Sequence, residues 1–205
     1  MGKVRAVCIS EKRGTQKKNI ESAVFVENWG IEGDAHAGNW HRQISLLSEE
    51  TIAAFKARGA EVTDGAFGEN LVVSGYDFTK FPVGTRFTCK DVVLELTQIG
   101  KECHHGCEIF QKMGECIMPT NGVFAKVLHG GKISVGDEFH VQYRAAVITL
   151  SDTASKGERE DASGAVAEEI VRKEGYEVVF KKIIPDDGDS LTAPVSYTHL
   201  TLPTT

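Results

Sequence analysis

The sequence contains no apolar run that approaches the roughly 20 residues needed for a membrane-spanning helix. Its N-terminal stretch, MGKVRAVCIS, lacks the apolar core and the small-residue cleavage site of a secretion signal. A basic surplus is missing too, because 29 acidic residues outnumber 23 lysines and arginines and leave a net charge of −6. We therefore expect a cytoplasmic protein that binds neither a membrane nor nucleic acid.

Cysteine is scarce but unevenly placed. The 205-residue chain has five cysteines, and three of them lie in the segment 100–116, GKECHHGCEIFQKMGEC. An odd number of cysteines in a reducing compartment indicates thiols or metal ligands rather than a framework of disulfides.

The segment 1–142 consists mainly of short strand-like runs separated by turns rich in glycine and aspartate. The expected strands are 4–10, 42–47, 69–73, 85–90, 91–99, 123–128 and 132–142. One helix is expected over 48–59, where Ser48 can cap the start and Gly59 ends the periodic pattern. The apolar fraction of 41% is enough for a core. This pattern predicts a mainly β fold, a β-barrel with small helices.

The pattern changes after residue 142. The continuous apolar run 144–151 predicts a buried parallel strand, 161–175 an amphipathic helix, and 176–185 a second strand. Together they predict one β-α-β unit of an α/β domain. We expect the segment 143–194 to be a partial domain, because a single unit cannot cover both faces of its sheet.

The cysteine-rich segment has five side chains suited to chemistry: Cys103, His104, His105, Cys107 and Cys116. Zinc is one interpretation, although all the ligands would come from one loop and no second CxxC motif is present. A buried set of inert small side chains is a second interpretation. A reactive thiolate is a third, since nearby cations stabilise a sulfur anion.

Lys101 and the two histidines are such neighbours of Cys103. Molybdenum in its oxo and pterin-dithiolene forms accepts thiolate sulfur, so one cysteine can complete its coordination sphere. The spacing alone leaves open whether the thiol binds molybdenum, carries a sulfane sulfur or senses redox state.

A glycine-rich loop, GIEGDAHAGNWHRQ (30–43), indicates a ligand site between strands. Its glycines let the backbone approach a ligand, and Asp34, His36, His41 and Arg42 form a polar mouth. Arg42 suits bidentate contact with phosphate. The glycines alone are also compatible with an ordinary loop.

A second loop, DGAFGENL (64–71), has the same character. Gly68 frees backbone N–H groups for an anion, and the amide of Asn70 can bond the edge of a pterin. The basic segment EKRGTQKK (11–18) adds Lys17 as a third contribution to an anion site.

The blocks KRGTQKK, GIEGDAHAGNWHRQISLL, DGAFGENL, PVGTRF, KECHHGC and GVFAKVLHGGKISVGDEF together resemble the MOSC domain, the C-terminal module of molybdenum-cofactor sulfurases. The resemblance covers about residues 3–140, with the blocks in order. It implies a barrel-like β fold that binds the molybdenum cofactor, and hence molybdopterin, or carries sulfur on a cysteine. By position, Cys103 matches the functional cysteine of the family.

The resemblance also implies partners. No pyridoxal-phosphate desulfurase segment precedes the barrel, so we expect sulfur to come from a sulfur-donor protein. Some relatives imply reduction of N-hydroxylated compounds at the bound cofactor. That activity would need an electron-donor partner, because no flavin or iron–sulfur motif is present. A zinc-binding or redox-thiol module is the alternative outside enzymes.

The C-terminal part, AAVITLSDTASKGEREDASG onward, resembles the start of the molybdopterin-binding domain of molybdopterin adenylyltransferases. Ser151 and Asp152 match the end of a strand in that fold, a common ligand-binding edge. The TGGTG segment of the family is missing, so we do not expect adenylyl transfer. The tail VSYTHLTLPT (195–204) resembles a translated sequencing-library adapter, and we expect residues 195–205 to be non-native.

Overall fold

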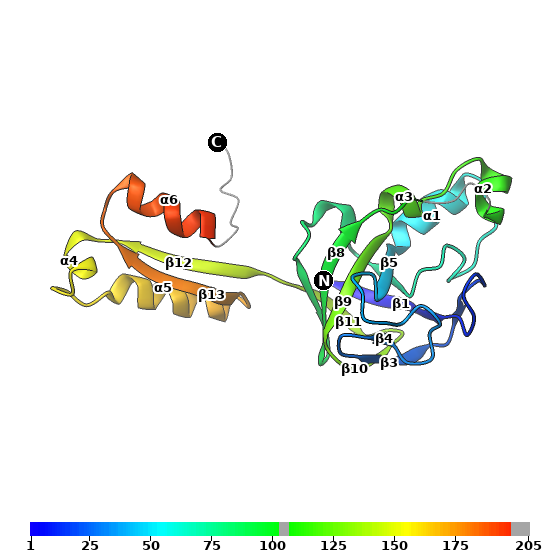
Figure 1. The fold of residues 1–205 in the computed structure, drawn as a ribbon, viewed down its shortest axis with the longest axis horizontal. Helices are drawn as coiled ribbons and strands as arrows, with labels where there is room; N and C mark the ends of the chain where they lie inside the picture. The colour runs from blue at the N-terminus through cyan, green and yellow to red at the C-terminus, as the bar shows by residue number, and fades with distance from the viewer. Residues whose placement is uncertain (103–106, 198–205) are drawn as a thin grey trace. The chain divides into compact units, whose positions relative to one another are not determined.

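The computed structural model describes residues 1–102 and 107–197 (Figure 1). The chain divides into two compact units, Met1–Val141 and a second that begins at Gln142. Among the helices in these ranges, none is long and apolar enough to cross a membrane.

The first unit is a closed β-barrel, as the sequence predicts. In the described part of the chain, seven strands form its wall. Their order is β11 (Glu138–Gln142), β7 (Arg86–Cys89), β8 (Val92–Ile99), β9 (Val123–His129), β5 (Ile44–Ser48), β6 (Leu71–Ser74) and β1 (Gly2–Ile9). Pairing of Gly2 with Phe139 joins β1 to β11 and closes the ring.

Shorter elements extend the barrel. The strand β2 (Lys18–Asn19) pairs with the end of β1, and β10 (Gly131–Ser134), β3 (Ser22–Val26) and β4 (Gly30–Ile31) form a small separate sheet. The helical elements are α1 (Glu49–Ala57), η1 (Phe78–Lys80), α2 (Glu108–Met113) and α3 (Met118–Asn121). The expected helix after residue 48 is confirmed, and the Ser48 hydroxyl accepts a hydrogen bond from the Thr51 N–H at 3.2 Å.

One strand expectation is wrong. The segment 132–142 forms two strands, β10 and β11, rather than one. Gly136 has φ of +91°, which breaks the extended conformation, and the Asp137 carboxylate accepts a hydrogen bond from the Ser134 N–H at 2.8 Å. The sequence analysis also missed β3, whose alternation of buried Ala23 and Phe25 with exposed valines is a regular strand pattern.

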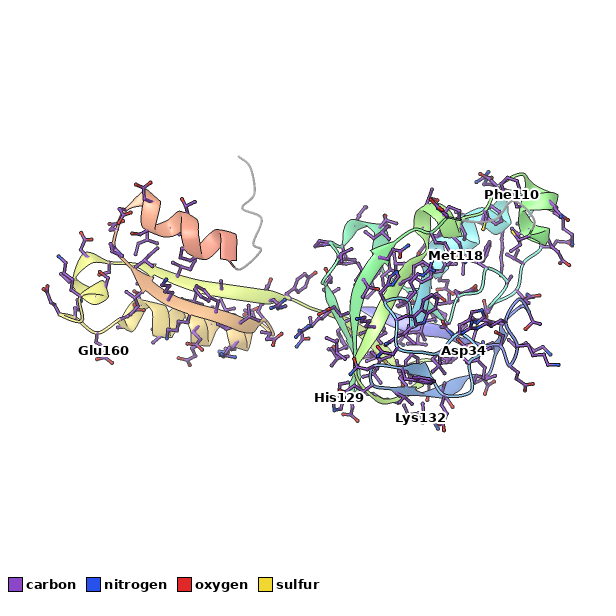
Figure 2. The ribbon with its side chains drawn as sticks, viewed as in Figure 1. Asp34, Phe110, Met118, His129, Lys132 and Glu160 are labelled. Carbon is purple, nitrogen blue, oxygen red and sulfur yellow. The ribbon has the colours of Figure 1, made fainter. Side chains whose placement is uncertain are left out.

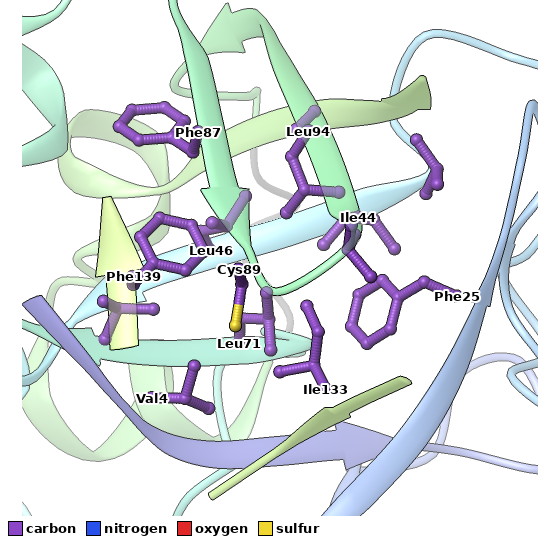
Figure 3. Packing of buried hydrophobic residues seen from close by; sticks show 14 of the residues in the cluster. Val4, Phe25, Ile44, Leu46, Leu71, Phe87, Cys89, Leu94, Ile133 and Phe139 are labelled. Atoms are coloured by element: carbon purple, nitrogen blue, oxygen red, sulfur yellow. The ribbon is translucent and has the colours of Figure 1, made fainter. Parts of the chain in front are cut away.

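The barrel interior holds the main core (Figure 3). Alternation along the strands turns Phe87, Leu94 and Phe139 inward. The rings of Phe87 and Phe139 stack with centroids 5.4 Å apart. A second apolar cluster lies on the outer face of the barrel wall. It contains Leu47 of β5 together with Ile52 and Phe55 of α1. Because both faces of the wall are packed with apolar side chains here, we expect a ligand to bind at the loops that follow the strands.

The second unit begins with two parallel strands, β12 (Arg144–Leu150) and β13 (Glu177–Ile184). The helix α5 (Ala162–Lys173) connects them and contacts both strands (Figure 1). Asp161 caps α5, because its carboxylate accepts a hydrogen bond from the Gly164 N–H at 2.8 Å. Two further helices, α4 (Asp152–Ser155) and α6 (Gly188–Tyr197), complete the described part. The predicted β-α-β unit is therefore confirmed.

Candidate functional site

A buried ion pair lies where the glycine-rich loop meets the basic segment. The Lys17 ammonium donates to Asp34 Oδ2 at 2.6 Å, and the two side chains are 3% and 1% exposed. The Asn70 amide donates to the same oxygen at 2.9 Å. The structure therefore brings together one predicted residue from each of the three glycine-rich or basic segments (Figure 2 labels Asp34).

The protonation states of this group follow from burial and pairing. Burial opposes ionisation of Asp34, but the hydrogen bonds from Lys17 and Asn70 outweigh it and hold the pKa of the carboxyl below its usual value. Burial lowers the pKa of the Lys17 ammonium, and pairing with Asp34 opposes that shift. The pair remains ionised because each charge has its counter-ion in contact.

Asn70 is held rigidly. Its side-chain oxygen accepts from the Ser45 N–H at 3.1 Å, and its amide also donates to the Cys8 carbonyl at 3.0 Å. The Ser45 hydroxyl donates to the Gly68 carbonyl at 2.9 Å. Asn70 thus ties the second glycine-rich loop to β5 and β1 with its polar atoms already bonded within the protein.

The loop beyond the ion pair borders a hollow of about 310 Å³. Its lining residues are Arg13, His36, Ala37, Gly38, Asn39 and Trp40. Two hydrogen bonds shape the wall: Trp40 Nε1 donates to the His36 carbonyl at 3.2 Å, and Arg13 Nε donates to the Ala35 carbonyl at 3.0 Å. Burial and the nearby Lys17 charge lower the pKa of His36, so its imidazole is neutral at pH 7.

Arg42 lies next to this wall. Its guanidinium carbon is 4.9 Å from the ring centroid of Trp40 and 5.5 Å from that of Phe124, so the cation lies between two aromatic side chains. Its Nε atom is buried and has no hydrogen-bond partner. A buried donor without an acceptor costs about 1–3 kcal/mol, which makes Arg42 a candidate for binding an acceptor from outside the protein.

His41 connects the same loop to the segment before the cysteines. Its Nε2 atom lies 2.9 Å from the Gln98 side-chain oxygen, and the Gln98 amide donates to the Gly100 carbonyl at 2.6 Å. Lys101 follows Gly100 directly and is half-buried. The polar mouth and the beginning of the cysteine-rich segment are therefore linked by hydrogen bonds.

The predicted catalytic residue, Cys103, lies outside the described residues, as do His104 and His105. Cys107 begins α2, and its sulfur accepts from the Phe110 N–H at 3.4 Å. Cys116 packs partly buried against the second apolar cluster. Within residues 1–102 and 107–197, no group of three histidine, cysteine or acidic side chains is placed to bind a metal.

The other two cysteines are not reactive thiols. Burial raises the pKa of Cys8 to about 12 and that of Cys89 to about 11, with acidic neighbours adding to both shifts. Both thiols are therefore protonated at neutral pH and behave as small apolar side chains of the core.

The sequence analysis missed Arg13 and Trp40 as site residues. Arg13 belongs to the basic segment from which only Lys17 was selected, yet Arg13 lines the hollow and Lys17 is buried. Trp40 lies between the predicted His36 and Arg42 and contacts both. Its position inside a polar loop, where a large aromatic side chain has no core to fill, was the available signal.

In the second unit, Ser151 and Asp152 follow β12, as expected. The Ser151 hydroxyl caps α4 by accepting from the Ala154 N–H at 3.2 Å. The Asp152 carboxylate accepts from the Asp186 N–H at 3.1 Å, which joins the ends of the two parallel strands.

Solved structures share this architecture. The YUAD protein from Bacillus subtilis is 22% identical, with 69% of this chain and 96% of that chain covered and a TM-score of 0.59. YiiM from Geobacillus stearothermophilus is 16% identical, with 86% of this chain and 94% of that chain covered and a TM-score of 0.54. At these identities the likeness shows the fold alone. No curated protein matches the sequence significantly.

Family models match both units. The model of the MOSC domain matches residues 33–140, more than half of the chain, and that of the "Probable molybdopterin binding domain" matches residues 146–201. Together the two matches support a role related to the molybdenum cofactor, with a molybdopterin-type ligand. The chain belongs to the MOSC domain family and carries a molybdopterin-binding domain after the barrel.

Proposed function

We propose that the MOSC barrel binds the molybdenum cofactor through its pterin-phosphate end, at the hollow and the adjoining Arg42. The observation that carries this proposal is the buried Nε of Arg42, which has no hydrogen-bond partner although the guanidinium is held between Trp40 and Phe124. An oriented arginine with an unused donor is suited to an incoming phosphate.

The chemistry of the lining residues fits such a ligand. Arg13 uses Nε for the Ala35 carbonyl, which leaves the other end of its guanidinium for an anion. Trp40 is 37% exposed, and its indole N–H is hydrogen bonded, so it offers a fixed aromatic surface to a planar ring. Asn39 is exposed on the same wall and provides an amide for a heterocycle edge.

Two predicted ligands take a different role in this proposal. The polar atoms of Lys17 and Asn70 bond Asp34 and the strands, so these residues support the loop from behind. In this proposal the cofactor is contacted by Arg13 and Arg42, and His36 and His41 lie next to the site.

The cofactor, when bound, supplies a redox-active metal that accepts thiolate sulfur. We propose Cys103 as the residue that meets this metal or carries a sulfane sulfur, and Lys101 as a cation that favours the thiolate. This proposal is supported by the hydrogen bonds from His41 through Gln98 to Gly100, a residue three positions before Cys103 in the sequence.

Cofactor content of purified protein tests the binding site. Wild-type protein from a cofactor-producing host should retain pterin fluorescence and molybdenum, and Arg42→Lys should retain about tenfold less, because an ammonium cannot reproduce the planar, stacked contact. Arg58→Lys is the matched control, since Arg58 also stacks on an aromatic ring, but its ring partner Phe55 does not line the hollow, whereas Trp40, the ring partner of Arg42, does. Equal retention in both variants would contradict the proposal.

Sulfur content tests the cysteine separately. Cys103→Ser should keep the pterin and lose cyanide-releasable sulfur, whereas Cys116→Ser should keep both. If Cys103→Ser retains as much sulfur as the wild type, the role proposed for Cys103 is wrong. Stoichiometric zinc without pterin in the wild type would support a zinc module instead.

A further inference from the structure

The carboxylate of Asp34 accepts hydrogen bonds from the two residues that flank the loop 11–16. The Ser10 N–H donates to its Oδ1 at 3.2 Å, and the Lys17 ammonium donates to its Oδ2 at 2.6 Å. Ser10 and Lys17 are buried, whereas the residues between them are exposed. The segment 11–16 is therefore a loop whose two ends are closed by the same buried side chain.

The same carboxylate is fixed to the barrel. Asn70 donates to Asp34 Oδ2 at 2.9 Å and is itself bonded to Ser45 of β5 and to the Cys8 carbonyl of β1. The Asp34 carboxylate is thus fixed to the barrel wall, in addition to the backbone hydrogen bonds that Asp34 makes with Ile31 and Ala37 in its own loop. Because the loop 11–16 is hydrogen bonded at both ends to this carboxylate, we expect its ends to be as rigid as the barrel wall.

The loop carries Arg13 to the hollow. Arg13 Nε donates to the carbonyl of Ala35, the residue after Asp34, and the Ala35 N–H donates to the Ser10 carbonyl at 2.8 Å. The segment 10–17 is therefore bonded to Asp34 and Ala35 through three of its residues, Ser10, Arg13 and Lys17. Arg13 is the member of this segment that lines the hollow.

Arg13 and Lys17 differ in whether their positive charge is already neutralised within the protein. Lys17 and Asp34 neutralise each other in a buried contact, so the pair adds no net charge to the hollow. A free carboxylate at Asp34 would repel an anionic ligand, but its oxygens already accept from Ser10, Lys17 and Asn70. Of Lys17 and Arg13, it is therefore Arg13, which lines the hollow, that remains for a ligand in addition to Arg42.

We infer that Asp34 is a positioning residue, which holds the loop 11–16 closed so that Arg13 meets the anionic group of the ligand. Asp34 and Lys17 do not contact the ligand themselves. This inference rests on the proposed function, because it requires that the hollow receives an anion. It goes further by adding Arg13 to Arg42 as a residue that contacts the anion and by giving Asp34 the role of positioning Arg13.

A double-mutant cycle tests the inference with neopterin monophosphate as the probe and neopterin as its uncharged counterpart. Asp34→Asn and Arg13→Gln should each weaken binding of the phosphorylated pterin by about tenfold, with little effect on neopterin. Because Asp34 acts through Arg13, Asp34→Asn should have almost no further effect when Arg13→Gln is already present. Additive effects of the two substitutions would overturn the inference.

Asp137→Asn is the matched control. Asp137 also accepts a backbone N–H, that of Ser134, and pairs with a lysine, Lys90, at 2.7 Å, but it lies outside the hollow. We expect it to leave binding of the phosphorylated pterin unchanged. If Asp137→Asn weakens binding as much as Asp34→Asn does, the effect of Asp34 is one of general stability and the inference fails.

Amide hydrogen exchange separates this inference from the proposed function. Asp34→Asn should speed exchange of the Ser10, Lys17 and Ala35 amides, which are hydrogen bonded at the two ends of the loop, and leave the amides of β8 unchanged, whether or not a ligand binds. If wild-type protein binds no phosphorylated pterin, the proposed function fails. Unchanged exchange at Ser10, Lys17 and Ala35 would overturn the positioning role. Lys17→Met, which removes the ammonium but keeps the carboxylate, provides the same measurement should Asp34→Asn not fold.

Discussion

Glu69 illustrates how a single buried side chain sets a pH response. It is fully buried, and its two carboxylate oxygens accept from the Gly65 N–H at 2.7 Å and the Phe67 N–H at 3.0 Å. Burial raises its pKa from 4.5 to about 7, and the backbone hydrogen bonds only partly oppose this shift. Glu69 therefore titrates near neutral pH within the loop that precedes Asn70.

The raised pKa of Glu69 makes the free energy of unfolding depend on pH. Between pH 4.5 and about 7 the folded protein holds a proton on Glu69 that the unfolded chain has released. The contribution of Glu69 to the free energy of unfolding therefore falls as pH rises through this range. In Glu69→Gln we expect this fall to be absent, which urea unfolding of both proteins at pH 5 and pH 8 would measure. An equal change in both proteins would contradict the shifted pKa.

The structure brings together three residues that the sequence suggested as ligands, but the sequence did not predict the contacts between them. Asp34, Lys17 and Asn70 were selected as ligands because their segments are polar and glycine-rich, and the structure brings all three together. A sequence pattern does not show that a charged residue is paired and buried, since pairing depends on contacts between distant segments. For the same reason it did not distinguish Lys17 from Arg13, whose exposure differs although they share one segment.

At the scale of elements, two glycines in one loop offer a comparison. Gly65 and Gly68 both have positive φ, +88° and +83°. A Cβ atom at Gly65 would meet the Lys17 carbonyl oxygen, whereas a Cβ atom at Gly68 would have no neighbour within 4 Å. Gly68→Ala should cost about 1 kcal/mol from backbone conformation alone.

Gly65→Ala should cost clearly more, because the Lys17 backbone would have to move away from Asp34. Thermal unfolding of the two variants measures the difference, and Gly14→Ala, at φ +77° with no neighbour for a Cβ atom, is a second control. If Gly65→Ala is no less stable than Gly68→Ala, the close packing of this loop on the basic segment is wrong.

The elements were well predicted where a local pattern decides them. The helix α1 begins after the expected cap, burial alternates along β7 and β8, and β9 is a mainly apolar run. Sequence reasoning did not separate β10 from β11, although Gly136 and Asp137 between them are residues typical of turns. It also failed at β4, which has only two residues and is defined by its pairing with β3.

The division of the chain into two compact units predicts that the barrel unfolds independently of the second unit. The main core belongs entirely to the first unit, and β11 closes the barrel just before the second unit begins. A fragment of residues 1–142 should therefore unfold cooperatively with the melting temperature of the barrel transition of the full chain. Calorimetry of the fragment and the full chain is the test, and a fragment without a transition would show that the barrel depends on the second unit.

The proposed function requires that arginine holds an anionic cofactor group at the mouth of the barrel. A crystal structure of cofactor-loaded protein is the decisive experiment. It should place the phosphate within hydrogen-bond distance, about 3 Å, of the Arg42 guanidinium and next to Arg13. A phosphate bound instead at a second hollow, of about 510 Å³, which Lys90 and His140 line, with both arginines unchanged, would contradict the proposed function.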